Sequence, residues 1–275
     1  MKTLILVLIF TVTIFSQGNL VIIGGGKRSA DIMEKIVELA GGSNAKILII
    51  PNASSEPIET GEYQKNEMLK FGAGNSEVLY FDCESANSDS VLAQTEGATG
   101  VFFSGGDQNK LTEDLLGTKL LAKIFKIYED GGVISGTSAG AAVMSNVMIT
   151  GNELKNLDSN SSYISIEEKN IQTAQGFGFV KGAIVDQHFA TRKRHNRLIS
   201  LVLENPELVG IGIDESTAIW VKQGGVFEVI GKYNVLVFDA REATGLRKDE
   251  SGGLFGRDIK MSVLGKGDVY ELIKK

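Results

Sequence analysis

Short apolar segments alternate with amphipathic segments along the first two thirds of the chain, and this alternation limits the fold more than any other feature. The apolar segments are rich in β-branched or aromatic residues and are followed by turn residues, which is typical of buried strands. They are Leu20–Ile23, Lys46–Ile50, Glu77–Phe81, Gly100–Phe103 and Val133–Ser135. Apolar strands separated by helices form parallel sheets that are covered on both faces. The sequence therefore predicts an α/β fold that binds ligands at the carboxyl ends of its strands.

The segment Leu120–Asp130 gives the clearest helix prediction, because its apolar residues share one face and Gly131–Gly132 follow as a stop signal. The last third of the chain has a different pattern. Three strand-like segments follow one another there with short polar connections: Thr217–Val221, Val226–Ile230 and Val235–Asp239. This pattern predicts an antiparallel meander at one edge of the sheet. The long polar segment between Gly151 and Gly176 is typical of an active-site lid or a mobile loop.

The first 17 residues have the layout of a secretory signal peptide, with Lys2, an apolar run over Leu4–Phe15 and small or polar residues after it. The apolar run is too short to span a membrane, which takes about 20 residues. A buried first strand is the alternative interpretation, but another strand-like segment follows at once. We therefore expect a secreted or periplasmic protein with a signal peptide at residues 1–17 and a single domain at residues 18–275.

Composition excludes several classes of protein. The net charge is −6 and no long Lys/Arg run occurs, so neither a nucleic-acid partner nor a basic membrane-surface helix is expected. Cys83 is the one cysteine, which excludes a disulfide framework and Cys-rich metal sites. His188 and His195 are the two histidines, so no catalytic zinc is expected. The segment Gly24–Ser29 resembles a dinucleotide-binding loop but lacks the last glycine of the G-x-G-x-x-G motif, so no cofactor is expected.

A candidate nucleophile lies in Gly136–Gly140, which reads GTSAG and connects a strand to an apolar, helix-like segment. Glycines on both sides of Ser138 allow a turn so tight that the serine side chain is exposed at the strand end. The N–H groups at the start of the helix then point toward a developing oxyanion. A tight turn with a buried serine is the alternative interpretation. The strand–turn–helix context favours the nucleophile.

A serine nucleophile needs a base and an acid that orients the base. His188 follows the strand-like Ala183–Val185, so we expect it at another strand end, whereas His195 lies among basic residues where a tuned neutral base is harder to form. His188 is therefore the predicted base, with a structural histidine as the alternative. Asp214 or Glu215, after the strand Val209–Ile213, should orient the imidazole, and spacing does not choose between them.

Two further groups of residues could bind a substrate. Ser104–Gln108 follows a strand, and its glycine N–H groups suit an oxyanion hole, while Gln108 adds an amide; a plain turn is the alternative. Our candidates for the oxyanion hole are the N–H groups of Gly106 and Ala139. Arg192, Arg194 and Arg197 lie close to His188 and favour bidentate recognition of carboxylates, with a solvated charged face as the alternative.

Six motifs, taken together, resemble the cyanophycinase family of peptidase clan S51, which also includes Asp-specific dipeptidases of the peptidase E type. They are Leu20–Gly26, Ile47–Ser54, Phe103–Leu111 (FSGGDQNKL), Gly136–Ala141 (GTSAGA), Asp186–Arg197 (DQHFATRKRHNR) and Gly210–Ala218 (GIGIDESTA). The resemblance implies a three-layer αβα sandwich with a mostly parallel sheet, like the class I glutamine amidotransferases, plus C-terminal antiparallel strands. It also implies a serine peptidase mechanism with Ser138 as nucleophile, His188 as base and Glu215 as third member. The positions implied to contact substrate are Gln108, Asp186, Gln187, Arg192, Arg194 and Arg197.

The same resemblance implies hydrolysis of cyanophycin, an arginine-decorated polyaspartate, to β-aspartyl-arginine dipeptides, and it implies a homodimer. An Asp-X or isoaspartyl dipeptidase is the alternative enzyme. A protein that binds acidic peptides without turnover is the alternative from another class, and the complete Ser/His/Glu set argues against it. One departure is Lys27–Arg28, where members of the family often carry an acidic pair.

Overall fold

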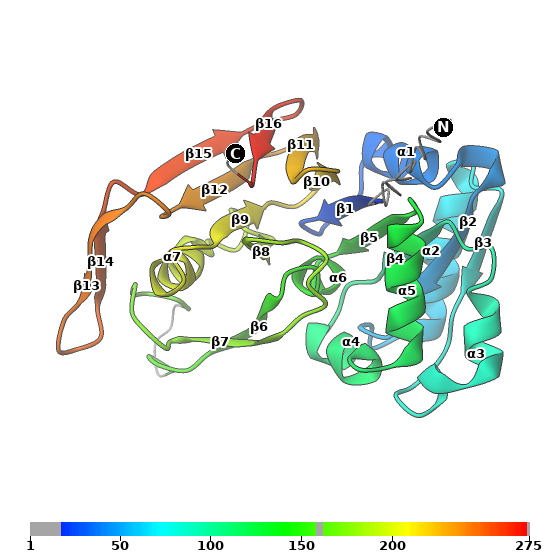
Figure 1. The fold of residues 1–275 in the computed structure, drawn as a ribbon, viewed down its shortest axis with the longest axis horizontal. Coiled ribbons are helices and arrows are strands. Elements are labelled where there is room, and N and C mark those ends of the chain that lie inside the picture. Colours follow the sequence, from blue (N-terminus) through cyan, green and yellow to red (C-terminus); the bar gives the residue numbers. More distant parts are fainter. Residues whose placement is uncertain (1–17, 158–161, 274–275) are drawn as a thin grey trace, which may run out of the picture.

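The structure is a computed structural model that describes residues 18–157 and 162–273 (Figure 1). The expected signal peptide at residues 1–17 lies outside the described residues, so its existence stays a prediction. Within the described part of the chain, no helix has the length and apolarity to cross a membrane.

The larger of two main sheets has eight strands in the order β16-β11-β10-β1-β5-β4-β2-β3. The strands are β1 (Asn19–Ile23), β2 (Lys46–Ile50), β3 (Asn75–Val78), β4 (Gly100–Phe103), β5 (Val133–Thr137), β10 (Thr217–Lys222), β11 (Val226–Gly231) and β16 (Val269–Glu271). Strands β3, β2, β4, β5 and β1 run parallel. Strands β10, β11 and β16 extend the sheet with antiparallel pairing beyond β1.

Helices cover both faces of this sheet because successive residues of each buried strand point to opposite sides. Leu20 and Ile22 of β1 pack on one face, and Val21 and Ile23 pack on the other. The second of these faces is covered by α1 (Ala30–Leu39) and α2 (Pro57–Lys70). The first is covered by α3 (Asp89–Gln94), α4 (Gln108–Leu115), α5 (Lys119–Glu129) and α6 (Ala139–Ala142). The predicted three-layer α/β fold is confirmed, and the helix expected at Leu120–Asp130 is α5.

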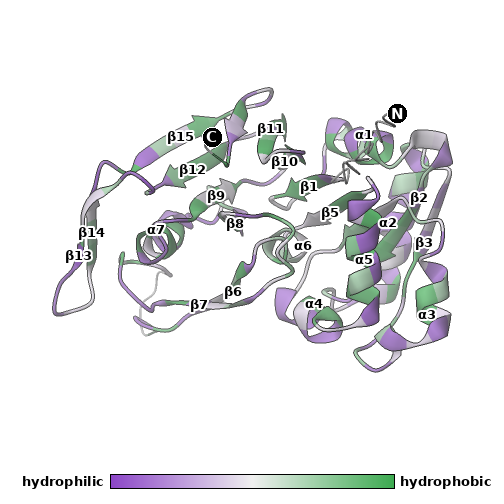
Figure 2. Cartoon of the chain, in the orientation of Figure 1, coloured by the Kyte–Doolittle hydropathy of each residue, from purple (hydrophilic) through white to green (hydrophobic). Residues whose placement is uncertain are grey.

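A second sheet has four strands in the order β15-β12-β9-β8. They are β8 (Ala183–Gln187), β9 (Val209–Ile213), β12 (Val235–Asp239) and β15 (Lys260–Leu264). Helix α7 (His195–Glu204) packs against this sheet. Two smaller antiparallel pairs complete the fold, β6 (Val147–Glu153) with β7 (Ile171–Gln175) and β13 (Thr244–Lys248) with β14 (Leu254–Arg257). Figure 2 shows hydrophobic residues concentrated in the strands of the two main sheets, while α5 carries both hydrophobic and hydrophilic residues.

The structure corrects two expectations about strands. The predicted meander is wrong at its third strand, because β12 pairs with β9 and β15 and not with β11. The connection 232–234 carries the chain from the first sheet to the second, where the wholly buried β9 needs an antiparallel partner. The strand expected at Glu77–Phe81 ends earlier, at Val78, because its pairing with β2 ends at Ile49.

The polar segment between Gly151 and Gly176 contains the end of β6 and all of β7, and residues 158–161 within it are outside the described residues. Its predicted function as a lid stays a prediction.

Candidate active site

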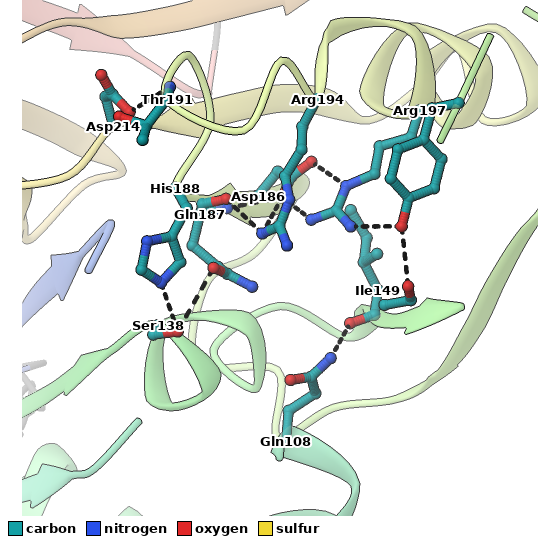
Figure 3. Close-up of polar contacts among 12 residues, drawn as sticks. Gln108, Ser138, Ile149, Asp186, Gln187, His188, Thr191, Arg194, Arg197 and Asp214 are labelled. Atoms are coloured by element: carbon teal, nitrogen blue, oxygen red, sulfur yellow. Dashed lines mark hydrogen bonds and ion pairs between the residues drawn. The ribbon is translucent and has the colours of Figure 1, made fainter. Parts of the chain in front are cut away.

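Three side chains from separate strand ends meet in one hydrogen-bonded line. Ser138 lies in the turn between β5 and α6, His188 follows β8 directly, and Glu215 lies in the turn between β9 and β10. His188 Nε2 lies 2.9 Å from Ser138 Oγ (Figure 3), and His188 Nδ1 lies 2.6 Å from Glu215 Oε1. Because β5 belongs to the first sheet and β8 to the second, the line joins the two sheets.

The turn that holds Ser138 is strained. Ser138 has φ 54° and ψ −107°, a conformation that L-residues rarely adopt. The backbone holds it there, since Ser138 N–H donates to the carbonyl of Ile23 at 3.0 Å and its own carbonyl accepts from Ala142. Gly140 is required by packing, because a Cβ at this residue would lie 2.3 Å from the carbonyl oxygen of Phe103. The tight contact between α6 and β4 therefore explains the last glycine of GTSAG.

The imidazole of His188 rests on bare backbone of the loop after β1. A Cβ on Gly25 would lie 2.3 to 2.8 Å from the imidazole ring atoms, and one on Gly26 would lie 2.9 Å from Cβ of Glu215. Gly25 also has φ +115°, a conformation that favours glycine. Gly25 and Gly26 thus make room for His188 and Glu215, a function that the comparison with dinucleotide-binding loops did not predict.

The surroundings of His188 favour the neutral form of its imidazole. Burial is the largest cause that lowers the pKa of His188, and the charges of Arg192 and Arg194 lower it further, against the hydrogen bond and charge of Glu215. A neutral imidazole whose Nδ1–H donates to Glu215 has a free lone pair on Nε2, which faces the Ser138 hydroxyl. This is the protonation state that a general base requires.

The structure separates the two acidic candidates. Glu215 contacts the imidazole, whereas Asp214 Oδ1 accepts a hydrogen bond of 2.9 Å from the backbone N–H of Thr191 (Figure 3). Asp214 therefore holds the turn that follows His188. His195 begins α7 and packs its ring against Phe189, with ring centroids 4.9 Å apart.

The loop after β4 and the start of α6 lie beside Ser138 on the side of the first sheet. A Cβ on Gly105 would lie 3.9 Å from Ser138 Oγ, so the loop after β4 passes beside the hydroxyl. The N–H groups of Gly106 and Ala139 have no hydrogen-bond partner among the described residues. Groups of this kind can stabilise the negative charge that develops on a substrate carbonyl.

The predicted substrate-contacting arginines have different surroundings. Arg197 is 1% exposed, and its guanidinium makes a two-pronged ion pair with Asp186, with Nε 2.7 Å from Oδ2 (Figure 3). Arg194 donates from Nη1 to the carbonyl of Gln187 at 2.7 Å, and burial followed by the charge of Arg197 lowers its pKa to about 10. Arg192 is exposed. The charge of Arg197 is thus neutralised inside the protein, while Arg192 and Arg194 remain closer to solvent.

The two predicted glutamines lie at different distances from Ser138. Gln187 Oε1 lies 3.5 Å from Ser138 Oγ, so the serine hydroxyl has a second acceptor beside His188. Gln108 lies farther off, and its Nε2 donates to the carbonyls of Ile149, at 2.9 Å, and Thr150 of β6 (Figure 3). Its amide therefore ties α4 to the start of the polar segment.

This geometry agrees with what comparisons with known proteins find. Residues 20–229 match the sequence model of Peptidase family S51. The chain belongs to this family. It is 32% identical over 264 residues to the cyanophycinase of Synechococcus elongatus, an alignment that covers 93% of this chain and 80% of the relative. It is 34% identical over 262 residues to the cyanophycinase of Trichormus variabilis, with 92% and 85% covered.

Among solved structures, the S51 chain is similar to a peptidase from an acI-B1 Actinobacterium, with a TM-score of 0.69 and 22% identity over 94% of this chain and 98% of the other. At this identity the likeness shows the fold. The family and its named relatives make the chain a serine-type peptidase. Within its described residues, no His, Cys, Asp or Glu side chains are grouped in threes or more as metal ligands would be.

Sequence reasoning missed one residue near the site of this S51 peptidase. The hydroxyl of Tyr163 accepts from Arg197 Nη1 at 3.1 Å, and its ring lies 5.1 Å from the guanidinium carbon. The same hydroxyl donates to the carbonyl of Gly151 at 2.8 Å. Tyr163 is the one aromatic residue between Gly151 and Gly176, but the sequence gives no sign that this segment reaches Arg197.

Proposed function

We propose that this chain is a cyanophycinase, which hydrolyses the arginine-decorated polyaspartate to β-aspartyl-arginine dipeptides by a serine mechanism. The observation that carries the proposal is the unbroken line of hydrogen bonds from Ser138 through His188 to Glu215. The similarity to proteins named cyanophycinase supports the choice of substrate.

In the first half of the reaction Ser138 Oγ attacks the carbonyl carbon of the scissile bond while His188 Nε2 accepts the hydroxyl proton. Glu215 holds the Nδ1–H and stabilises the imidazolium that forms. As the tetrahedral intermediate collapses, the C–N bond breaks and His188 gives its proton to the leaving amine. An ester between Ser138 and the acyl part of the substrate remains.

In the second half, His188 removes a proton from water, which attacks the ester carbonyl, and the serine leaves with that proton. The N–H groups of Gly106 and Ala139 are proposed to bind the oxyanion in both halves. Their freedom from other described partners and the passage of the loop 104–107 beside Ser138 Oγ support this assignment.

Recognition of the substrate's free carboxylates is assigned to Arg192 and Arg194, because Asp186 already neutralises Arg197. Asp186 and Arg197 then act as positioning residues that hold β8, and with it His188, against α7. Gln187 and Gln108 are also proposed to contact substrate, and the 3.5 Å distance from Gln187 Oε1 to Ser138 Oγ supports this for Gln187. Arginine forks suit carboxylates in a chain whose net charge of −6 otherwise repels them.

Export and assembly belong to the same proposal. The pattern of residues 1–17 supports secretion or export to the periplasm, which would suit an enzyme that scavenges external polymer. A homodimer is proposed on the resemblance to the family. Sequencing the N-terminus of exported protein and measuring its mass in solution test these two points.

The central test is incubation of the enzyme with cyanophycin and with a panel of α- and β-aspartyl dipeptides, followed by mass analysis of the products. We expect β-aspartyl-arginine from the polymer with wild type and none with Ser138→Ala. Cleavage of dipeptides alone would make the chain a dipeptidase. Binding of the polymer without any product would make it a binding protein and would overturn the proposal.

A further inference from the structure

The two parts of the loop after β1 are held in different ways. In the first part, the carbonyl of Gly24 accepts a hydrogen bond of 2.7 Å from the backbone N–H of His188. The carbonyl of Gly25 accepts one of 2.8 Å from the backbone N–H of Ser216. In the second part, the backbone of residues 26–28 makes no hydrogen bond to the described part of the chain. This second part therefore needs a side chain to hold it in place.

Arg28 supplies that side chain. It donates to Glu67 Oε2 of α2 from Nε at 2.9 Å and from Nη2 at 2.6 Å, and the two side chains are 10% and 14% exposed. The guanidinium carbon lies 5.9 Å from the ring centroid of Tyr63 on α2 and 5.7 Å from that of Phe102 on β4, within the range of cation–π attraction. The second part of the loop is thus fixed to α2 and to β4 through one guanidinium.

An ion pair at this level of burial adds direction more than it adds stability. Removing two charges from water costs about as much free energy as their attraction returns, so an apolar pair of similar volume often stabilises a protein as well. A guanidinium that donates twice to one carboxylate, in contrast, fixes the relative position of both groups. The contribution of Arg28 and Glu67 is therefore a defined position for residues 26–28 relative to α2.

The position of this loop determines the position of two catalytic side chains. The imidazole of His188 packs on Gly25 so closely that a Cβ there would lie 2.3 Å from the ring. The side chain of Glu215 packs on Gly26, where a Cβ would lie 2.9 Å from its own Cβ. Gly26 lies in the part of the loop that Arg28 anchors. A shift of that part would therefore move the surface on which the base and its acid rest.

We propose that Arg28 is a positioning residue of the catalytic centre, because its ion pair with Glu67 holds the loop that supports the catalytic imidazole. The inference rests on the proposed function, in which His188 is the base. Loss of the ion pair would leave every catalytic group in the chain but would free the ring from its support. A displacement of about 1 Å between reacting groups costs up to about 100-fold in rate.

The titration of His188 reports on this support without any substrate. Burial is the largest cause that lowers the pKa of His188, the charges of Arg192 and Arg194 lower it further, and Glu215 raises it. If the loop loses its anchor, water reaches the imidazole and the protonated form is better solvated. The pKa should then rise toward the ordinary value of histidine.

Two variants separate support from a direct effect of charge. Arg28→Met removes a positive charge and Glu67→Gln removes a negative one, so a direct effect would raise the pKa of His188 in the first variant and lower it in the second. Loss of support should raise it in both. The pKa is measured by NMR of the imidazole signals, which are simple to assign because the chain has two histidines and His195→Ala removes one signal.

Activity gives the second measurement. On cyanophycin, kcat should fall about tenfold to 100-fold in Arg28→Met and Glu67→Gln with little change in KM, because the groups that bind substrate are retained. Arg28→Lys should keep part of the activity, since an ammonium keeps the charge but loses the planar fork.

Arg241→Met is the matched control. Arg241 pairs with Asp239 at 2.8 Å, and the two side chains are 20% and 4% exposed. Asp239 lies opposite Val209 at the start of β9, whereas Glu215 follows the other end of that strand. The control should lower the urea midpoint of unfolding while kcat and the titration of His188 stay as in wild type.

Three results would overturn the inference while the proposed function stands: wild-type kcat and titration in Arg28→Met, a lower pKa of His188 in Glu67→Gln, or the same changes in Arg241→Met. If wild type cleaves neither cyanophycin nor aspartyl dipeptides, the proposed function fails, and the titration of His188 decides the inference separately. If Arg28→Met does not fold, Glu67→Gln keeps the shape of its side chain and carries the same comparison.

Discussion

The two main sheets bring different kinds of side chain to the active site. Among the described residues, every buried Asp, His and Arg side chain lies on β8, β12 or α7 or just after β8 or β9: Asp186, His188, Arg197, Asp214 and Asp239. The first sheet buries neutral groups instead, such as Ser104, Ser135 and Thr137. Ser138 and the N–H groups of Gly106 and Ala139 belong to this neutral side.

This difference follows from what each sheet must do. The first sheet needs dipoles at fixed positions, and backbone N–H groups supply these without burying a charge. In the proposed mechanism the second sheet supplies proton transfer and carboxylate recognition, which need charge, and a buried charge must be paired. Changes on the first sheet should therefore affect the chemical step, and changes on the second should affect stability and recognition as well.

The largest effect should come from the first sheet. Ser138→Ala removes the nucleophile while leaving every buried charge paired, so we expect kcat to fall by about 10⁶-fold with little change in the urea midpoint of unfolding. Rapid-quench product analysis and denaturation followed by circular dichroism measure the two quantities. Substantial turnover by the alanine variant would mean that another group is the nucleophile.

The largest effect on stability should come from the second sheet. Asp186→Asn leaves the guanidinium of Arg197 buried without a counter-charge, which should cost about 3–5 kcal/mol in the free energy of unfolding. Glu96→Gln, which removes an exposed pair with Lys123, is the control and should change little. If both variants unfold at the same urea concentration as wild type, Asp186 and Arg197 do not act as a structural pair.

Substrate recognition should distinguish the arginines. Arg192→Ala and Arg194→Ala should lower kcat/KM on the polymer about tenfold or more, since hydrogen bonds to charged groups contribute about 1.5–3 kcal/mol. The same variants should act nearly normally on a neutral ester, and Arg→Lys should restore activity only in part. An equal loss on both substrates would show that these residues support the fold and do not contact the substrate.

The smallest effect concerns pH. Protonation of His188 abolishes its function as a base, so kcat/KM should fall as pH falls through the pKa of His188, which burial lowers below the usual range of histidine. Arg192→Gln removes a cation that lowers this pKa, so the acidic limb should move toward neutral pH. His195→Ala should keep the wild-type profile. If the acidic limb changes in His195→Ala and not in variants that alter the surroundings of His188, then His188 is not the base.

Sequence reasoning located the strand ends better than it located the partners of each side chain. Ser138 and His188 were predictable because strand-like segments end just before them. The choice between Asp214 and Glu215 depended on which one the turn after β9 aims at the imidazole, and spacing carries no such information. The pairing of β12 was not predictable either. It depends on β9 having one edge that β8 leaves free, and that edge exists only once the second sheet has formed.

Gly25 and Gly26 allow the imidazole of His188 and the side chain of Glu215 to pack directly against the backbone of the loop after β1. This loop therefore positions the imidazole and the carboxylate through the absence of side chains, and a larger residue at Gly25 or Gly26 would clash with them. In a saturation library, tolerance should be asymmetric: positions that hold the catalytic groups by their own side chains accept near-isosteric replacements with graded loss, whereas Gly25 admits no replacement without displacing the ring. Redesign of substrate specificity should therefore change residues elsewhere around the active site and leave the loop after β1 unchanged.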